Sequence, residues 1–249
     1  MERDDLHGLR VLVTRPQPQA QDLARKIVAL GGVPRICPML EIVPLRPPQA
    51  GWWQGFDWIV FVSANAVRAA VAAGLPRQLD ARLAAIGPAT ASALKKAAFP
   101  VACQAPPPYT SESLLSLPEF AAPGGKRVLI VRGEGGRELL AKELERRGST
   151  VAHLELYRRR PPRREIAAAL QDGLRQGLDA VLATSGEILA NLQKAAGTRL
   201  LQLRQLPLIV ASPRLARMAQ RDGFVEVVTA ASASDEAMLA TLKQHFANR

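Results

Sequence analysis

The chain has 249 residues, of which 48% are hydrophobic and 22% charged, which excludes a disordered protein and fits one large or two ordinary globular domains. Lys and Arg number 33 against 22 Asp and Glu, and the resulting net charge of +11 predicts an acidic partner: nucleic acid, a membrane surface or a polycarboxylate. Only two cysteines occur, Cys37 and Cys103, which excludes a disulfide scaffold or thiolate zinc site and indicates a reducing compartment.

The termini and apolar runs give no sign of export or membrane insertion. The first residues, "MERDDLHGLR", lack the apolar core of a signal peptide. Apolar runs such as "WIVFV" at 58–62 are far shorter than the roughly 20 residues of a membrane span. Three histidines are dispersed without an acidic cluster. We therefore expect a cytoplasmic protein with no metal and no membrane segment.

The first half of the chain predicts two kinds of α/β unit. The first is a strand at 10–15 ("RVLVTR"), an amphipathic helix at 20–32 that stops at glycine, and a second strand. The second begins with a buried strand at 57–63 ("DWIVFVS") and continues through "AAIGPATASAL" at 84–94. A helix at 110–117, capped by a Ser or Asp, completes it.

The second half of the chain repeats both units. "RVLIVR" at 127–132 matches "RVLVTR" at an offset of 117 residues, and a helix at 137–148 follows. "DAVLATS" at 179–185, "LIVASPRLARM" at 208–218 and "SDEAMLATL" at 234–242 then repeat the second unit. Alternating strands and helices predict parallel sheets flanked by helices. The repeat leaves two assemblies open: neighbouring units pair, or the first pairs with the last and the middle two pair together.

The basic run "RRRPPRR" at 158–164 is one of several proline-rich joints. Pro161 and Pro162 exclude a regular helix there. A nucleic-acid arm would gain from interleaved aromatic residues, and the chain is only 4% aromatic. We interpret the run as a solvated joint. Tyr157, just before it, departs from the repeat, because the equivalent position in the first copy is Leu40.

The turn "VRGEGGREL" at 131–139 joins a predicted strand to a helix. It is no phosphate-binding loop, and Glu138 stands where a dinucleotide motif has its third glycine. An ordinary βα turn and a carboxylate-binding turn beside Arg132 both remain open. Hydroxyl residues recur at the predicted strand ends, where they cap helices or form two polar rims at the ligand-binding edges of the sheets. They are Thr14, Ser63, Thr90, Thr184, Ser185 and Ser212.

Taken together, seven motifs make the chain similar to bacterial uroporphyrinogen-III synthases from about Leu9 to Leu242. In order they are "VLVTRP", "FVSANAV", "IGPATASAL", "YTSESLL", "VLIVRGEGGRELLAKEL", "LELYRR" and "ATSGEILANL". The resemblance implies an α/β protein with two similar domains, each a parallel β-sheet flanked by helices, joined by a two-stranded β linker. Domain 1 would be 1–38 plus 166–249 and domain 2 would be 45–157, with linkers at 39–44 and 158–165.

The implied reaction converts hydroxymethylbilane, a linear tetrapyrrole with eight carboxylates, into cyclic uroporphyrinogen III with release of water. The last pyrrole ring is inverted through a spiro intermediate. The family needs no cofactor and no metal. The resemblance also implies a monomer, and the positive charge is compatible with transient contact to the enzyme that supplies the unstable substrate.

The resemblance also assigns site residues by motif position. Tyr157 would be catalytic and would donate a hydrogen bond or a proton to the departing hydroxyl. The substrate-binding set would be Arg15, Ser63, Thr90, Arg132, Gly133, Thr184, Ser185, Ser212 and Arg214. One motif departs from the family pattern, because "ASPRLA" has Arg214 and Leu215 where some members have threonines. Arg214 would bind a carboxylate instead.

Two other classes of function compete with this interpretation. A non-catalytic, two-domain tetrapyrrole- or anion-binding module would bind the substrate and leave the isomer formed unchanged. A nucleic-acid-binding protein would show affinity that falls steeply with salt. The second is the weaker rival, because the sequence has no helix-turn-helix, zinc finger or aromatic platform.

Overall fold

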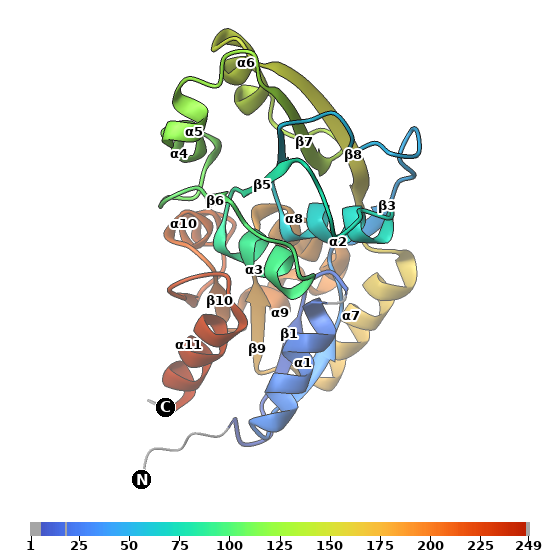
Figure 1. Ribbon diagram of the computed structural model, residues 1–249. Coiled ribbons are helices and arrows are strands. Elements are labelled where there is room, and N and C mark those ends of the chain that lie inside the picture. The colour runs from blue at the N-terminus through green and yellow to red at the C-terminus, as the bar shows by residue number, and fades with distance from the viewer. Residues whose placement is uncertain (1–5, 18, 248–249) are drawn as a thin grey trace. The chain divides into compact units, whose positions relative to one another are not determined.

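The computed structural model describes residues 6–17 and 19–247. The chain divides into two compact units (Figure 1): unit 1 is Met1–Glu41 with Arg160–Arg249, and unit 2 is Ile42–Arg159. Each unit has its own sheet, with parallel strands and helices on both faces. The predicted α/β class is confirmed. None of the described helices is both long enough and apolar enough to cross a membrane.

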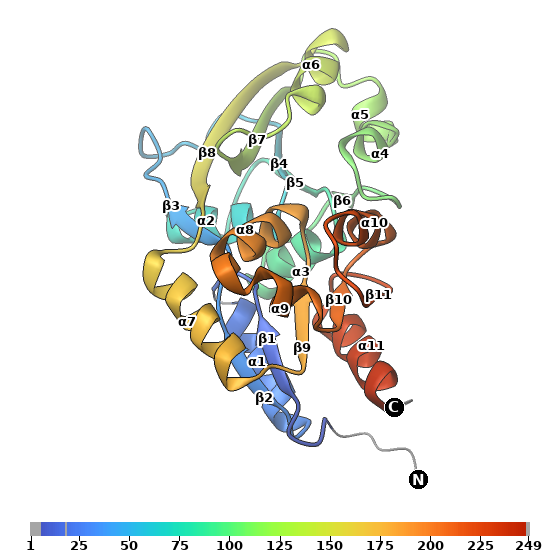
Figure 2. The same ribbon diagram turned by 180° about the vertical axis from the view of Figure 1, so that it is seen from behind.

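Unit 1 is built on a five-stranded parallel sheet in the order β11-β10-β9-β1-β2. The strands are β1 (Arg10–Val13), β2 (Val33–Ile36), β9 (Ala180–Ala183), β10 (Leu208–Val210) and β11 (Val227–Thr229). Helices α1 (Gln19–Ala29) and α11 (Asp235–Ala247) pack on one face, against Val11, Val13 and Ile209. The remaining helices contact one another (Figure 2): α7 (Arg164–Gln176), α8 (Gly186–Ala196), η1 (Gly197–Arg199), α9 (Leu200–Arg204) and α10 (Pro213–Arg221).

Unit 2 contains a six-stranded sheet in the order β3-β8-β7-β4-β5-β6. The strands are β3 (Glu41–Pro44), β4 (Trp58–Phe61), β5 (Arg82–Ala85), β6 (Cys103–Gln104), β7 (Arg127–Gly133) and β8 (Thr150–Arg160). All of them except β3 are joined by parallel pairings. The helices are α2 (Ala64–Ala72), α3 (Pro88–Lys96), α4 (Ser111–Leu115), α5 (Pro118–Ala121) and α6 (Leu139–Arg146).

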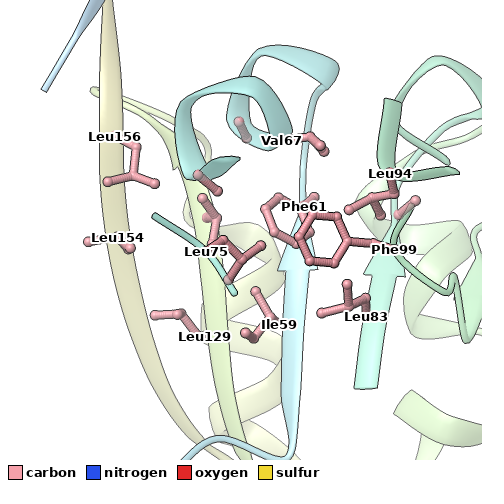
Figure 3. Packing of buried hydrophobic residues seen from close by; sticks show 14 of the residues in the cluster. Ile59, Phe61, Val67, Leu75, Leu83, Leu94, Phe99, Leu129, Leu154 and Leu156 are labelled. Atoms are coloured by element: carbon pink, nitrogen blue, oxygen red, sulfur yellow. The ribbon is translucent and has the colours of Figure 1, made fainter. Parts of the chain in front are cut away.

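The unit 2 sheet has a hydrophobic core on each of its two faces. Ile59 and Phe61 point toward α2 and α3, where they meet Val67 and Leu94 (Figure 3). The alternate residues of β4, Trp58 and Val60, belong to the opposite core with residues of α4, α5 and α6. Because successive strand residues face opposite sides, a strand covered on both faces must be apolar throughout. This explains the unbroken run "WIVF".

The chain passes between the units twice, through neighbouring strands. β3 begins at Glu41 and β8 ends at Arg160, and the two strands are hydrogen-bonded neighbours in the sheet. The arginine run is therefore mostly regular structure: β8 continues to Arg160, α7 starts at Arg164, and only 161–163 lie between them. The two prolines of the run fall in that short break.

The sequence repeat reappears as the same arginine–aspartate contact in each unit. In unit 1 the backbone N–H of Arg10 donates to the Asp179 carboxylate at 2.7 Å, and its guanidinium donates to both carboxylate oxygens at 3.0 Å. In unit 2 the backbone N–H of Arg127 donates to Asp57 at 2.8 Å. Arg10 and Arg127 are 117 residues apart, the offset of the repeat. Each sheet thus joins one copy of the first repeat to one copy of the second.

We expect Asp179→Ala to lower the stability of unit 1 by about 1 kcal/mol, because a partly buried backbone N–H and a partly exposed guanidinium lose a shared acceptor. The hydrogen bond from Arg10 holds the pKa of Asp179 below its ordinary value. Its contribution is therefore present above about pH 4 and disappears as the pH falls through the lowered pKa. Urea unfolding followed by hydrogen exchange in unit 1 peptides should show a difference from wild type that is larger at pH 7 than at pH 3.

Asp172→Ala is the matched control, since the ion pair of Asp172 among the described residues is with Arg175, three residues along the same helix. Both side chains of that pair are at least half exposed, so its loss should change the free energy of unfolding by no more than about 0.5 kcal/mol. Equal effects of the two substitutions would contradict the conclusion that Asp179 stabilises unit 1 through its contacts with Arg10.

Two predicted helices are shorter than the sequence indicated. The helix expected at 20–32 ends at Ala29, because Gly31 adopts a positive φ of 73°. The helix expected at 137–148 begins only at Leu139, because the preceding residues form the glycine-rich turn. The predicted Ser or Asp cap is present at α11, where Ser234 accepts from Ala237 N–H. At α4 the capping residue is instead Thr110, which accepts from Ser113 N–H.

Candidate functional site

The strand order reverses once in each sheet, and the reversals locate the candidate site. In unit 2 the chain proceeds from β4 outward to β5 and β6, and from β7 outward to β8 on the other side. In unit 1 the same reversal lies between β1 and β9. Ligands of open α/β sheets bind beyond the carboxyl ends of the strands at such a reversal. Ser63 and Gly133 lie there in unit 2, and Arg15 and Thr184 in unit 1.

In unit 2 the hydroxyl of Tyr157 lies 2.9 Å from the Oγ of Ser63. Ser63 precedes α2 in an extended conformation and caps the helix, its Oγ accepting from Ala66 N–H at 3.1 Å. Tyr157 comes from β8, which is separated from β4 by β7. Its side chain is packed into the core of this unit, and the residue is 6% exposed. The phenol therefore crosses a whole strand to reach the serine.

Gly133, the last residue of β7, provides the space for that crossing. A Cβ at this position would lie 2.6 Å from Cε2 and Cζ of Tyr157 and 3.0 Å from its hydroxyl oxygen. A real side chain cannot approach that closely. The ring therefore occupies the volume that a side chain of β7 would need.

An irregularity in β8 turns Tyr157 in this direction. Arg132 is opposite Glu155, but Gly133 is opposite Tyr157, so β8 has one extra residue, Leu156, at this point. Such a bulge breaks the alternation of side chains and redirects the next one. Leu156 and Tyr157 consequently belong to the same core cluster, although they are adjacent in the strand. In the first copy β2 ends at Ile36, so its equivalent residue, Leu40, lies beyond the strand.

The guanidinium of Arg132 organises the glycine-rich turn. It pairs with Glu138 at 2.7 Å and Glu155 at 3.2 Å, and it donates to the carbonyl oxygen of Gly136 at 3.3 Å. Its side chain is 10% exposed, and the pair with Arg132 lowers the pKa of Glu138. The turn is thus folded around a neutralised cation. The predicted contact of Arg132 with a substrate carboxylate stays a prediction, and it would require one of these partners to give way.

Thr90 lies beyond the next strand of unit 2, in the first turn of α3. The helix begins at Pro88 after Gly87, and the Thr90 N–H donates to the Gly87 carbonyl at 3.0 Å. Thr90 is buried. The first turn of α3 contains no acidic residue, so the positive end of the helix dipole is not offset locally.

In unit 1 the residues after β1 are engaged within the protein. The Thr14 hydroxyl donates to the Leu182 carbonyl at 2.6 Å, which ties β1 to β9. Arg15 pairs with Asp235 of α11 at 2.5 Å, and the two side chains are 12% and 13% exposed. Burial lowers the pKa of Arg15, and Asp235 partly offsets that effect. Lys26 binds the same aspartate at 2.9 Å. The predicted role of Arg15 in substrate binding likewise stays a prediction.

The hydroxyl residues after β9 and β10 cap the following helices. Ser185 accepts from Ile188 N–H at 3.2 Å, and Ser212 accepts from Leu215 N–H at 3.3 Å. Thr184, just before the first of these caps, is half-buried. Arg214, in the first turn of α10, is exposed and stands at the amino end of that helix. Of the predicted cations, Arg214 has the side chain most accessible to an incoming carboxylate.

Sequence reasoning missed the acidic partners of the two buried arginines. The sequence indicates Asp235 only as part of the repeated segment "SDEAMLATL", and Glu138 only as a residue that breaks a glycine motif. Glu155 gives a weak signal, because it is a charged residue between two leucines, two positions before Tyr157. Within the described part of the chain, no three His, Cys, Asp or Glu side chains are grouped so that they could hold a metal ion.

Comparison with known proteins gives one family throughout. A family model described as uroporphyrinogen-III synthase HemD matches residues 21–240. The uroporphyrinogen-III synthase of Salmonella typhimurium is 32% identical over 251 residues, covering 94% of this chain and 100% of that protein. The Escherichia coli protein of the same name is 32% identical over 248 residues, with the same coverage.

Solved structures are similar in fold. The uroporphyrinogen III synthase of Thermus thermophilus, a mutant form, matches with a TM-score of 0.61 at 23% identity and covers 97% of this chain and 100% of its own. The uroporphyrinogen-III synthetase of Helicobacter pylori matches with a TM-score of 0.62 at 17% identity and the same coverage. At these identities the likeness concerns the fold.

Proposed function

Because this chain belongs to the uroporphyrinogen-III synthase family, we propose that it closes hydroxymethylbilane to uroporphyrinogen III, with inversion of the terminal pyrrole ring and loss of water. The observation that carries the proposal for this chain is the Tyr157–Ser63 pair, which lies 2.9 Å apart where the strand order of unit 2 reverses. It puts a proton donor at the edge of the sheet where ligands bind.

The proposed reaction involves no covalent bond between the substrate and the protein. The hydroxyl of the terminal hydroxymethyl group takes up a proton and leaves as water, and the pyrrole N–H is lost, so that the remaining methylene carbon becomes part of an azafulvene. The substituted carbon of the last pyrrole attacks this methylene carbon to form a spiro intermediate. The spiro centre fragments and recloses with the ring inverted. Tyr157 assists the first step by donating to the departing oxygen. The remaining residues hold a flexible chain in the conformation that leads to inversion.

Both units contain hydrogen-bond donors that suit the carboxylates of the substrate. The first turns of α2, α3 and α10 contain no acidic residue, and their N–H groups form the positive ends of helix dipoles. Arg214 adds an exposed guanidinium to α10, and the net charge of +11 favours an octacarboxylate ligand. We assign these turns, together with Thr90, Thr184, Ser185 and Ser212, to carboxylate and pyrrole contacts.

The selection of one isomer needs only a modest energy difference. Without catalysis the azafulvene closes directly to the symmetrical type I isomer. A preference of a hundredfold for the type III product corresponds to a difference of about 2.7 kcal/mol between two transition states. A few oriented hydrogen bonds and ion pairs can supply that amount.

The direct test supplies hydroxymethylbilane to the purified protein, oxidises the product and measures the ratio of type III to type I porphyrin. We expect type III to predominate, against type I in a sample without protein. A ratio equal to the protein-free sample would remove the proposal. Tight binding of the substrate with that unchanged ratio would instead favour a non-catalytic tetrapyrrole-binding module.

We expect Arg214→Glu to raise the KM for hydroxymethylbilane about tenfold with little change in kcat, because the exposed guanidinium would be replaced by a charge that repels a carboxylate. Arg217→Glu, on the next turn of α10 and also exposed, is the control for net charge. Equal effects of the two substitutions would indicate a general charge effect and contradict a specific contact at Arg214.

We also propose that the protein works as a cytoplasmic monomer, which meets the preceding enzyme transiently to receive its substrate. The two cysteines support a reducing compartment: both are free, and burial raises the pKa of each thiol to about 11. Sedimentation of the purified protein, alone and with the enzyme that makes hydroxymethylbilane, tests both points. A stable dimer, or a stable complex of the two enzymes, would contradict them.

A further inference from the structure

Tyr157 can reach its partner only because two neighbouring features of the backbone permit it. The extra residue Leu156 redirects the side chain, and Gly133 leaves the path over β7 empty. Gly133 does not have the positive φ for which glycine is often required. The need for glycine at this position is therefore steric: the nearest atoms to a Cβ would be those of the tyrosine ring.

The same contacts allow two arrangements of the hydroxyl protons of Ser63 and Tyr157. Ser63 Oγ accepts a hydrogen bond from Ala66 N–H, so one of its two lone pairs is occupied. Either hydroxyl of the Ser63–Tyr157 pair can be the donor. If Tyr157 donates, its proton points at the serine. If Ser63 donates, the phenol proton is free to point at a ligand, and the bonds run in one direction from Ala66 N–H through Ser63 to Tyr157.

The second arrangement has a physical advantage for a reaction that expels hydroxide as water. Hydrogen bonds that run in one direction polarise one another, so each donor in the chain becomes stronger. The chain here starts at the first turn of α2, where the helix dipole is positive and no acidic residue opposes it. The phenol at its end is thereby made a better donor to a leaving oxygen.

We propose that Gly133 and Ser63 act on the reaction through Tyr157, as positioning residues that do not bind the substrate themselves. Gly133 leaves the space for the ring, and Ser63 donates to the phenol oxygen so that the phenol proton faces the leaving hydroxyl. This inference rests on the proposed function for its chemical consequence, but its geometric part can be measured without substrate.

The geometric test uses the small number of tyrosines, since the chain has only Tyr109 and Tyr157. Protein labelled with carbon-13 in the tyrosine rings should give two sets of ring resonances, which Tyr157→Phe assigns. Gly133→Ala should move the resonances of Tyr157 and leave those of Tyr109 in place. Gly124→Ala is the control, because a Cβ there would meet only the Arg147 carbonyl oxygen at 3.9 Å and the φ is not positive; it should move neither set.

The kinetic test compares single and double variants. Gly133→Ala should lower kcat for the type III isomer about a hundredfold, because the donor is displaced by an ångström or more. Ser63→Ala should lower it about tenfold, while Ser63→Thr, which keeps the hydroxyl in an extended conformation that suits threonine, should restore most of the rate. In a Tyr157→Phe background, Gly133→Ala and Ser63→Ala should have little further effect, because no phenol remains to be positioned.

The outcomes separate the inference from the proposed function. An unmoved Tyr157 resonance in Gly133→Ala would overturn the steric role. Further losses of tenfold or more in the Tyr157→Phe background would show that Gly133 or Ser63 contacts the substrate directly, and would also overturn the inference. A wild-type protein that produces only the type I isomer would overturn the proposed function, and with it the catalytic part of the inference, whatever the resonances show.

Discussion

Tyr157→Phe should lower kcat for uroporphyrinogen III formation by about a hundredfold and leave KM for hydroxymethylbilane nearly unchanged. A positioned proton donor contributes on the order of 10²–10⁴ in rate, and we expect the low end because the azafulvene also forms spontaneously. The ring is retained in the variant, so the packing against Gly133 and the core around Leu156 is preserved. Loss of a transition-state contact lowers kcat without raising KM.

The ratio of type III to type I porphyrin is a second, independent measurement on Tyr157→Phe. The spontaneous closure to type I continues at its own rate, so a slower enzyme should release a larger fraction of type I porphyrin. Tyr109→Phe is the matched control, since Tyr109 is the other tyrosine and is 41% exposed. Its kcat and its isomer ratio should equal those of wild type. A Tyr157→Phe enzyme with unchanged turnover would eliminate the phenol as a donor.

Stability measurements should separate a chemical defect from a folding defect. Tyr157 is buried, and its hydroxyl bonds to Ser63. Removal of one such hydrogen bond costs about 1 kcal/mol. A variant with a far larger loss of stability would have lost activity through unfolding, so the free energy of unfolding must be measured beside kcat.

The sequence predicted the parts of this architecture that repeat or follow a local period. The two copies of each strand–helix unit are recognisable because the same apolar pattern must recur wherever the same sheet position is covered on both faces. Ser63 was assigned as a residue at a strand end before a helix, and its capping bond to Ala66 follows from local geometry alone. Tyr157 was singled out because it broke the repeat.

The repeat also contains a shared Gly-x-Asp pattern just before a strand in each unit. Gly55 and Asp57 in unit 2 correspond to Gly177 and Asp179 in unit 1, each as glycine, any residue, aspartate. Both glycines have positive φ, and at both a Cβ would lie within 3.0 Å of the arginine that the aspartate binds. Comparison of the two copies therefore indicates from sequence that the Gly-x-Asp pattern has the same local role in both units, while its arginine partners follow from the strand order.

Contacts that depend on strand order lay beyond the reach of the sequence. The crossing of Tyr157 over Gly133 requires that β7 lie between β8 and β4 and that β8 carry one extra residue. Neither the strand order nor the extra residue produces a recognisable pattern of apolar residues in the sequence. The partners of Arg132 and Arg15 were hidden for the same reason: Asp235 is 220 residues away from Arg15, and only the fold brings α11 to the end of β1.

The Arg15–Asp235 pair gives the largest expected effect on stability. Asp235→Ala should lower the stability of unit 1 by about 3 kcal/mol, because Arg15 would remain largely buried without the carboxylate that pairs with it directly. Its Nε has no hydrogen-bond partner among the described residues, and the remaining compensation would be the hydrogen bond from the guanidinium to the Ala233 carbonyl and the charge of Glu236. Urea unfolding read by hydrogen exchange in peptides of β1 and β9 would report unit 1 directly.

Glu236→Ala is the matched control, because Glu236 pairs with Lys26, acts on Arg15 only through its charge and has a side chain that is 76% exposed. That change should be within about 0.5 kcal/mol of wild type. The double variant Arg15→Met with Asp235→Ala should recover most of the lost stability, since an apolar side chain of similar length needs no counter-charge. Its failure to recover would show that Asp235 stabilises unit 1 through α11 and not through Arg15.

The same double variant decides what Arg15 does in the reaction. If Arg15 binds a substrate carboxylate, a stable Arg15→Met, Asp235→Ala protein should still have a KM for hydroxymethylbilane raised about tenfold, because a charge-assisted contact is missing. If its charge serves only Asp235, as the buried pair at 2.5 Å favours, KM and isomer ratio should match wild type once stability is restored. We expect the second result, because an arginine that left Asp235 for the substrate would leave that carboxylate buried with Lys26 as its remaining cation.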